Sequence, residues 1–275
     1  MIRMQHISSL ALSFAALGSF AHASWNGGRD DLVAYGYTTA NKLIKFEDDR
    51  PERAWTIGTV SGLIGDTALV GIDFRPATGE LYGLGNAGGI YTLDKYNAVA
   101  TLHSQISIAL SGASFGIDFN PVFGSLRVVG DDGQNLRVDA DTGAATADPA
   151  LNYIGAVAAG VTGVAFTNND SDANTETTRF EIDTLLDQVA IQAPRNSGSL
   201  TATGKLRLDA GQDVGFDIYS RVRYGTTVEN VALAALRVGG QSRLYRIDLL
   251  TGRASCRGSF SSHHQVIGLA IALDQ

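Results

Sequence analysis

The stretch that decides the fold is Gly71-Ile72-Asp73-Phe74, which recurs as Gly116-Ile117-Asp118-Phe119. Looser copies follow further along the chain, as Gly163-Val164-Ala165-Phe166, Gly215-Phe216-Asp217-Ile218 and Gly268-Leu269-Ala270-Ile271. Successive motif glycines are 45, 47, 52 and 53 residues apart. Repeats of about 40–50 residues are typical of β-propeller blades.

Each period continues in short strand-like pieces separated by turn residues. After the first motif, a turn at Arg75–Gly79 leads to a strand at Glu80–Leu84, and a turn at Asn86–Gly89 leads to Ile90–Asp94. Segments of this kind, bounded by Gly, Asn, Asp and Pro, are hairpin signals, and no segment keeps a helical period. Four antiparallel strands per period indicate one propeller blade.

The two ends of the repeat complement each other. The last motif copy begins at Gly268 and has no hairpins after it, whereas strand-like segments precede the first copy at Leu32–Tyr37, Lys42–Glu47 and Ala54–Thr59. Joining Gly268–Leu273 to these segments completes a fifth blade and removes free sheet edges. We therefore predict an all-β, five-bladed β-propeller closed by strands from both termini, with a β-sandwich as the main alternative.

The N-terminal residues predict export. Arg3 precedes an apolar run that ends at Ala21-His22-Ala23, and small residues at this spacing suit a signal peptidase. The run is shorter than the roughly 20 apolar residues of a membrane helix. We expect residues 1–23 to be a signal peptide cleaved near Ala23, and residues 24–275 to form a single propeller domain in the periplasm or outside the cell.

Charge and cysteine content narrow the choice of partners. The formal net charge is −7, and no Lys/Arg cluster stands out, which argues against nucleic acid or an anionic membrane as partner. No later segment predicts a membrane span. Cys256 is the only cysteine, so an apolar core rather than disulfide bonds must hold the domain together. We expect a monomer.

These landmarks resemble a family of bacterial secreted proteins known as domain of unknown function 4394. The resemblance covers nearly all of residues 30–275 and rests on the paired motif copies, on Leu81–Leu84, on Gly163–Asn169 and on Gln192–Leu200. The last segment is the most specific, because it breaks the blade pattern with a defined Pro/Asn/Gly spacing. The resemblance implies a propeller-like fold and export, and it supplies no activity to carry over.

The motif aspartates are the first candidate site. On a strand, Ile72 and Phe74 face one way and Asp73 faces the other, toward the central channel. Asp118 and Asp217 occupy equivalent positions, so three carboxylates are placed to gather at one axis, where they would bind a cation or act on a sugar as glycosidase carboxylates do. Their repetition favours the alternative, in which each accepts hydrogen bonds from a neighbouring turn.

The insertion that begins at Asn168 is the second candidate. Oxygen-bearing side chains alternate along it, at Asp170, Asp172, Asn174 and Glu176. Glu181 follows Asp170 by eleven residues, which imitates a calcium loop, but Thr175 stands where such a loop needs glycine. We expect no cofactor other than this candidate calcium ion, and a solvated loop is the favoured alternative.

No catalytic motif appears, whether a Ser-His-Asp order, a nucleophile elbow or a phosphate loop. A sugar-stacking surface could form from Trp25, Trp55, Tyr82, Tyr91 and Tyr245, although scattered strand aromatics usually pack in the core or across strands. We therefore predict an exported, non-catalytic propeller that binds a ligand or protein at its channel mouth. The alternative is a glycan-active hydrolase using Asp73, Asp118 and Asp217. Binding is expected where the chain departs from the repeat, at Asn168, Asn169, Gln192 and Asn196.

Overall fold

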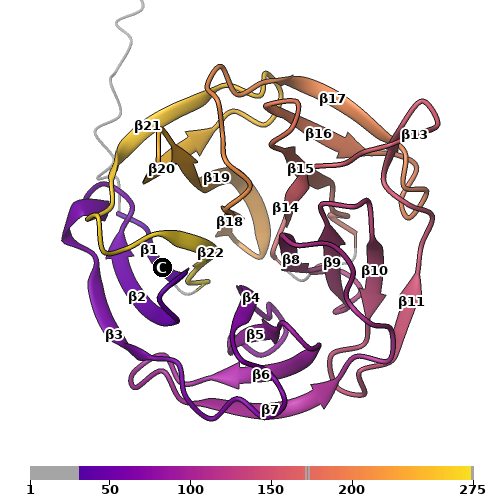
Figure 1. Cartoon of the computed structure of the whole chain (residues 1–275). Helices are drawn as coiled ribbons and strands as arrows, with labels where there is room; N and C mark the ends of the chain where they lie inside the picture. The colour runs from indigo at the N-terminus through magenta and orange to yellow at the C-terminus, as the bar shows by residue number, and fades with distance from the viewer. Residues whose placement is uncertain (1–30, 171, 173, 274–275) are drawn as a thin grey trace, which may run out of the picture. The chain divides into compact units, whose positions relative to one another are not determined.

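The five motif copies form the innermost strands of five four-stranded antiparallel sheets, the blades of a propeller (Figure 1). The computed structural model describes residues 31–170, 172 and 174–273. The predicted signal peptide, residues 1–23, lies outside the described residues. The chain from Asp31 onward forms one compact unit.

Four blades consist of strands that are consecutive in the sequence. In each, the motif strand is innermost and the next three strands follow outward, as Figure 1 shows. From the second blade to the fifth, the strands are β4 (Leu69–Phe74), β5 (Leu81–Gly85), β6 (Gly89–Leu93) and β7 (Ala100–Gln105); β8 (Phe115–Phe119), β9 (Leu126–Gly130), β10 (Asn135–Val138) and β11 (Ala145–Ala147); β14 (Val161–Phe166), β15 (Arg179–Asp183), β16 (Gln188–Gln192) and β17 (Leu200–Lys205); β18 (Val214–Arg223), β19 (Thr226–Val238), β20 (Gln241–Ile247) and β21 (Ala254–Ser259).

The first blade joins the two ends of the chain. From the axis outward, its strands are β22 (Val266–Ile271), β1 (Val33–Thr38), β2 (Lys42–Glu47) and β3 (Trp55–Thr59), with a short 3₁₀ turn at Pro51–Arg53 before β3. Ala34 pairs with Ile271 and Tyr37 with Gly268. The predicted five-bladed propeller, closed by strands from both ends, is therefore confirmed.

The motif glycines allow the inner strands to approach one another. A Cβ atom on Gly116 would lie 2.9 Å from the Gly163 Cα, and a Cβ on Gly215 would lie 2.7 Å from the carbonyl carbon of Gly268. Packed carbon atoms prefer separations of about 3.5–4.0 Å, so a side chain at these positions would force the strands apart. Between them the strands leave a space of about 10 Å³, enough for about one water molecule.

Apolar side chains fill the interfaces between blades unevenly. Within the described residues, four of the five interfaces hold clusters of 11 to 14 buried apolar residues. The interface between the third and fourth blades holds seven, and none of these is aromatic. A small hairpin, β12 (Asn152–Tyr153) and β13 (Ala156–Val157), connects these two blades. Polar side chains therefore occupy part of this one interface.

No helix within the described ranges is long and apolar enough to cross a membrane.

Candidate functional site

The interface between the third and fourth blades carries charged side chains where the other blades do not. Three positions on the second strand of a blade are involved. Arg127 stands opposite the third motif residue of its blade, Asp118. Arg179 stands opposite the fourth motif residue of the next blade, Phe166, and Glu181 opposite the second, Val164. The residues that stand at these positions in the remaining blades, in the same order, are Tyr35, Tyr82, Phe180 and Leu233; Ala34, Leu81, Leu126 and Ala232; and Gly36, Gly83, Val128 and Ala234.

Arg127 of β9 and Arg179 of β15 meet at one amide. Arg127 Nη1 donates to Asn135 Oδ1 at 2.8 Å, and Arg179 Nη1 donates to the same oxygen at 3.3 Å. Arg127 also donates to Asp148 and to Asn196 Oδ1, each at 2.7 Å. Both guanidinium groups are buried, with Arg127 4% and Arg179 6% exposed. The two blades are therefore joined through a buried pair of cations.

The two carboxylates beside these arginines, Asp148 and Glu181, differ in their hydrogen bonding. Asp148 accepts from Arg137 as well as from Arg127. Arg179 Nε lies 2.7 Å from Glu181 Oε1, yet neither oxygen of Glu181 accepts a well-aligned hydrogen bond from the described residues. Asp148 is therefore a fully used ion-pair partner, whereas Glu181 keeps unused acceptor capacity at a position with no exposure.

Burial works against most of the charges in the cluster. It lowers the pKa of Arg127 to about 10, and the positive charge of Arg179 adds to the effect. It lowers the pKa of Arg179 as well. Burial raises the pKa of Glu181 to about 7, against the attraction of Arg179 and Arg127. Burial would also raise the pKa of Asp148, but hydrogen bonds from its two arginines together lower it. Glu181 is therefore the carboxyl group here that changes protonation near neutral pH.

A cavity of about 230 Å³ opens beside the two arginines. It is lined by Asn120, Arg127, Phe166, Thr177, Thr178, Arg179, Ile191, Gln192, Ala193, Arg195 and Asn196. Three of these side chains are cationic and none is acidic. The Gln192 side chain is only 7% exposed, and neither its oxygen nor its nitrogen has a hydrogen-bond partner among the described residues. The wall of the cavity therefore contains three cations and a buried amide without a partner among the described residues.

The segment Gln192–Leu200, which the sequence singled out, forms the rim of this cavity. Its turn is closed by a hydrogen bond from Ala193 N to Ser199 O, and it docks on the β12–β13 hairpin through one from Asn152 N to Gly198 O. A Cβ on Gly198 would lie 2.3 Å from Ala150 O, so only glycine permits this approach. The docked turn places Asn196 against Arg127 and holds Arg195 over the Phe123 ring, 4.3 Å from its centroid.

The three motif aspartates come together at the axis. One carboxylate oxygen from each of Asp73, Asp118 and Asp217 lies within 4.8 Å of the others. Each carboxylate accepts a hydrogen bond from a backbone N–H in the motif of the next blade. Asp73 accepts from Phe119, Asp118 from Phe166 and Asp217 from Ile271.

Their environment is closed to solvent, since none of the three is more than 5% exposed. Burial raises the pKa of Asp217 to about 6, and it also raises the pKa values of Asp73 and Asp118, where repulsion between the carboxylates adds to the effect. The arrangement links inner strands of different blades. It gives no support to the hydrolase alternative, because a glycan and a water molecule would have to reach the carboxylates.

The insertion after β14 is tied to the fifth blade. Asn168 N donates to Asn230 Oδ1, and Asn169 N and Nδ2 donate to Ser220 Oγ and Ile218 O. Asp170 accepts from the backbone and hydroxyl of Thr227. Burial is the largest single influence on Asp170 and raises its pKa, but these hydrogen bonds and one from Asp172 N together lower it. Asn168 and Asn169 therefore anchor the loop, and they lie outside the cavity lining.

Asp172 and the backbone carbonyl of Glu176 accept hydrogen bonds from within the candidate calcium loop. Asp172 Oδ1 accepts from the backbone and side chain of Asn174, while Glu176 O accepts from Asn168. Within the described residues, the carboxylates of Asp170, Asp172 and Glu176 do not form a group with oxygens close enough to share an ion. Glu181 lies apart on β15, inside the interface described above.

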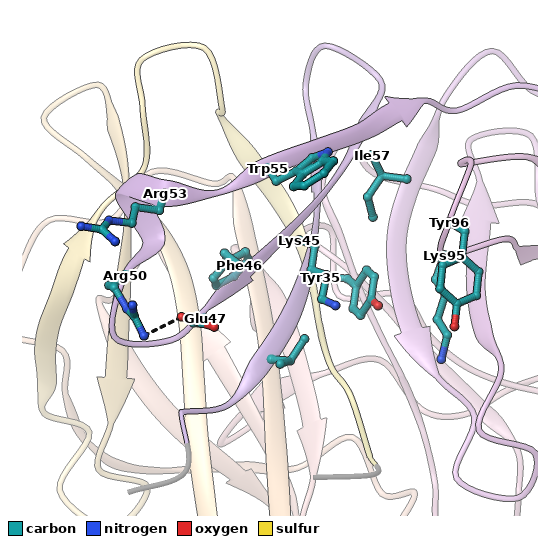
Figure 2. Close-up of a pocket in the computed structure, with 11 residues that line it drawn as sticks. Tyr35, Lys45, Phe46, Glu47, Arg50, Arg53, Trp55, Ile57, Lys95 and Tyr96 are labelled. Atoms are coloured by element: carbon teal, nitrogen blue, oxygen red, sulfur yellow. Dashed lines mark ion pairs between the residues drawn. The ribbon is translucent and has the colours of Figure 1, made fainter.

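A second, larger concavity of about 600 Å³ lies against the first blade and the turn after β6 (Figure 2). Trp55 of β3 and Tyr96 of the turn are 74% and 81% exposed, and Lys45 and Lys95 lie with them along the groove. Arg50 pairs with Glu47 at 2.7 Å, as Figure 2 shows. Of the strand aromatics, Tyr82, Tyr91 and Tyr245 are buried, so Trp55 does not share a stacking surface with them.

Sequence reasoning found the rim of the cavity but not its charged wall. Gln192 and Asn196 were expected to bind, and they line one cavity together. Arg127 and Arg179 were not singled out, and Glu181 was considered only for its calcium-loop spacing from Asp170. Aligning the repeats would have revealed them, because a charged residue replaces an uncharged one at an equivalent strand position. Arg127, for example, stands where the preceding blade has Tyr82.

The fold and this cavity define the chain as a five-bladed propeller with a cationic pocket between two blades. It belongs to the family described as domain of unknown function (DUF4394), which it matches over residues 42–270. No functionally curated protein matches the chain significantly.

Solved structures resemble the chain at low sequence identity. A protein of unknown function from Bacteroides thetaiotaomicron is 12% identical with a TM-score of 0.50, over 88% of this chain and 67% of that one. The allergen Mala s 1 of Malassezia sympodialis is 15% identical with a TM-score of 0.40, over 79% and 65% of the two chains. A Lactobacillus plantarum protein is 13% identical with a TM-score of 0.41, over 88% and 99%. The chain spans about two thirds of the first two structures. The first similarity concerns the fold alone.

Proposed function

We propose that this protein is an exported, non-catalytic propeller that binds a small polar ligand in the cavity between its third and fourth blades. The observation that carries the proposal is Gln192, a buried side chain whose amide has no partner among the described residues although it lines a cavity. An unsatisfied buried polar group costs about 1–3 kcal/mol. A ligand that hydrogen-bonds to this amide would offset that cost.

The size and rigidity of the cavity favour a small molecule over a polymer. Its volume of about 230 Å³ lies just below the range of about 300–1,000 Å³ that is typical of small-molecule pockets. Its rim is held on the β12–β13 hairpin by the backbone hydrogen bond between Asn152 and Gly198, and on the third blade by the hydrogen bond between Arg127 and Asn196. A site that is ordered before binding loses less conformational entropy when the ligand arrives.

The non-catalytic part of the proposal follows from the placement of the acidic groups. The carboxylates that would serve a hydrolase, Asp73, Asp118 and Asp217, are buried in backbone hydrogen bonds. Export follows from the N-terminal pattern up to Ala23. It is tested by fractionating cells and sequencing the N-terminus of the mature protein; an uncleaved protein in the cytoplasm would contradict it.

Binding is tested by screening the purified protein against a library of polar metabolites by thermal shift, with hits confirmed by calorimetry. The key variant is Gln192→Leu, which keeps the side-chain size and removes the amide. We expect it to fold and to lose binding, while Trp55→Ala, in the groove of Figure 2, binds as the wild type does. Hits that survive Gln192→Leu but fail with Trp55→Ala would move the ligand site to the groove and refute the proposal.

A further inference from the structure

We propose that the ligand of this cavity carries an oxyanion, such as a carboxylate, bound by Arg127, Arg179 and Arg195, with Gln192 binding a neutral polar part of the same molecule. This inference rests on the proposed function and deepens it by assigning the ligand's chemical class. The cavity lining supplies these three cations and no acidic side chain.

The cluster behind the cavity has an excess of buried positive charge when Glu181 is protonated. The side chains of Arg127, Arg179, Asp148 and Glu181 are at most 6% exposed, whereas that of Arg137 is 38% exposed and keeps contact with solvent. Protonation of Glu181 therefore leaves one buried positive charge uncompensated. A buried charge without a partner is strongly unfavourable, so an anion entering the cavity would supply the missing charge.

Unused donors accompany the charge. Arg127 Nε and Arg179 Nη2 are buried and have no hydrogen-bond partner within the described residues. Guanidinium groups form paired, charge-assisted hydrogen bonds with carboxylate, sulfate and phosphate groups. Arg195 lies at the rim, stacked over Phe123, where it would meet the part of the anion nearest to solvent.

The repeat indicates that the fold does not need these charges. At the positions of Arg127, Arg179 and Glu181, the other four blades use uncharged residues, which are aliphatic, aromatic or glycine, and still form the same sheets. Replacing buried ion pairs by apolar residues is often neutral or stabilising. Charges kept at a cost to stability are typical of binding sites.

Glu181 makes anion binding depend on pH. The groups that face it are Arg179 on its own strand, Arg127 from the third blade and Tyr153 from the β12–β13 hairpin. As an ionised carboxylate, Glu181 competes with the ligand for the arginines; as a neutral acid it does not. Because its pKa lies near 7, affinity should fall as the pH rises through neutrality. Ligand binding should be accompanied by proton uptake in that range.

The test compares anions with neutral molecules of the same shape. The probes are succinate against succinamide and benzoate against benzamide, with inorganic phosphate and sulfate as separate arms, measured by calorimetry at pH 6 and pH 8. We expect the carboxylates to bind at least about tenfold more tightly than their amides, since a charge-assisted hydrogen bond adds on the order of 1.4 kcal/mol. Binding by phosphate or sulfate in place of carboxylates would assign the tetrahedral anion.

Two variants test the residues without removing a buried arginine. Arg195→Gln removes an exposed cation of the rim and should weaken anion binding about fivefold or more. Glu181→Gln removes the competing carboxylate; it should tighten binding at pH 8 and abolish the difference between pH 6 and pH 8. Lys45→Gln, a cation of the groove in Figure 2, is the matched control and should change nothing.

The outcomes separate this inference from the proposed function. If amides bind as well as carboxylates, and both variants leave affinity unchanged while Gln192→Leu abolishes it, the anion is refuted and the ligand site stands. If Gln192→Leu has no effect on any ligand, the proposed function fails. If Lys45→Gln rather than Arg195→Gln weakens anion binding, the anion belongs to the groove and the inference is overturned.

Discussion

Replacing Glu181 by glutamine should stabilise the protein at alkaline pH, although it removes one partner of a buried ion pair. Glu181 has no exposure, and burial raises its pKa from 4.5 to about 7 despite the nearby Arg179 and Arg127. The free-energy cost of burying this charge therefore exceeds the stabilisation that its attraction to the two arginines provides. Glutamine has the shape of the neutral carboxylic acid and removes that cost.

The magnitude follows from the interval between the two pKa values. A carboxyl group with a raised pKa takes up a proton on folding, so its contribution to stability is present below pH 4.5 and is lost as the pH rises to about 7. At about 1.4 kcal/mol per pH unit, the loss is on the order of 3 kcal/mol. Wild type and Glu181→Gln should be nearly equal at pH 4.5 and should differ by about this amount at pH 8, in favour of the variant.

The assay is urea denaturation followed by circular dichroism at several pH values between 4.5 and 8. Taking the difference between the two proteins cancels the titration of groups that they share. Glu229→Gln is the matched control, because it removes a surface partner of Arg246 and should change stability by less than about 0.5 kcal/mol at every pH. A Glu181→Gln variant that is less stable than the wild type at pH 8 would refute the reasoning, since the ion pair would then contribute net stability.

Three further substitutions test other parts of the structure. Gln192→Leu should raise the free energy of unfolding by about 1–2 kcal/mol in urea denaturation, because it removes an amide without partners among the described residues; a loss of stability would show that the amide is satisfied. Gly116→Ala should lower it by about 1–3 kcal/mol or more, because its Cβ would collide with the next inner strand, whereas Gly211→Ala, with 3.5 Å to its nearest neighbour, should be tolerated. Asp217→Ala should destabilise the protein by about 2–4 kcal/mol at pH 5, since Ile218 N and Ile271 N lose their acceptor. Because the pKa of Asp217 is raised to about 6, wild-type stability falls between about pH 4 and pH 6 through this group. The variant should show a shallower fall in that same interval, and an unchanged slope would contradict the assignment.

The fold was largely predictable because a propeller repeats both its contacts and its residues. The motif at Gly71 needs glycine for the close approach of inner strands and apolar residues for packing between blades, so each copy carries the same pattern. The split blade followed from counting strands, and Ala34 does pair with Ile271. The observed strands at the N-terminal end begin and end within one residue of those predicted.

The candidate site was predictable only in part. That Asp73, Asp118 and Asp217 share an axis follows from the repeat, but their hydrogen bonds to other blades depend on how neighbouring blades are staggered, which a sequence does not state. The position of Gln192 beside Arg127 depends on the same stagger, because the two lie on different blades. The turn at Gln192–Leu200 could be singled out as irregular, but its docking on Asn152 could not.

The shared first blade has a mechanical consequence. β1 and β22 are antiparallel, and Val33 O accepts from Ala272 N at the edge of the pair where both segments leave the sheet. Tension applied between Leu32 and Ala272 would therefore load that hydrogen bond first and then the next, one at a time, as in opening a zipper. Force applied along the strands, between residues at opposite ends of this pair, would load several of its hydrogen bonds at once. The seam that completes the ring is thus a point of low resistance to tension between Leu32 and Ala272.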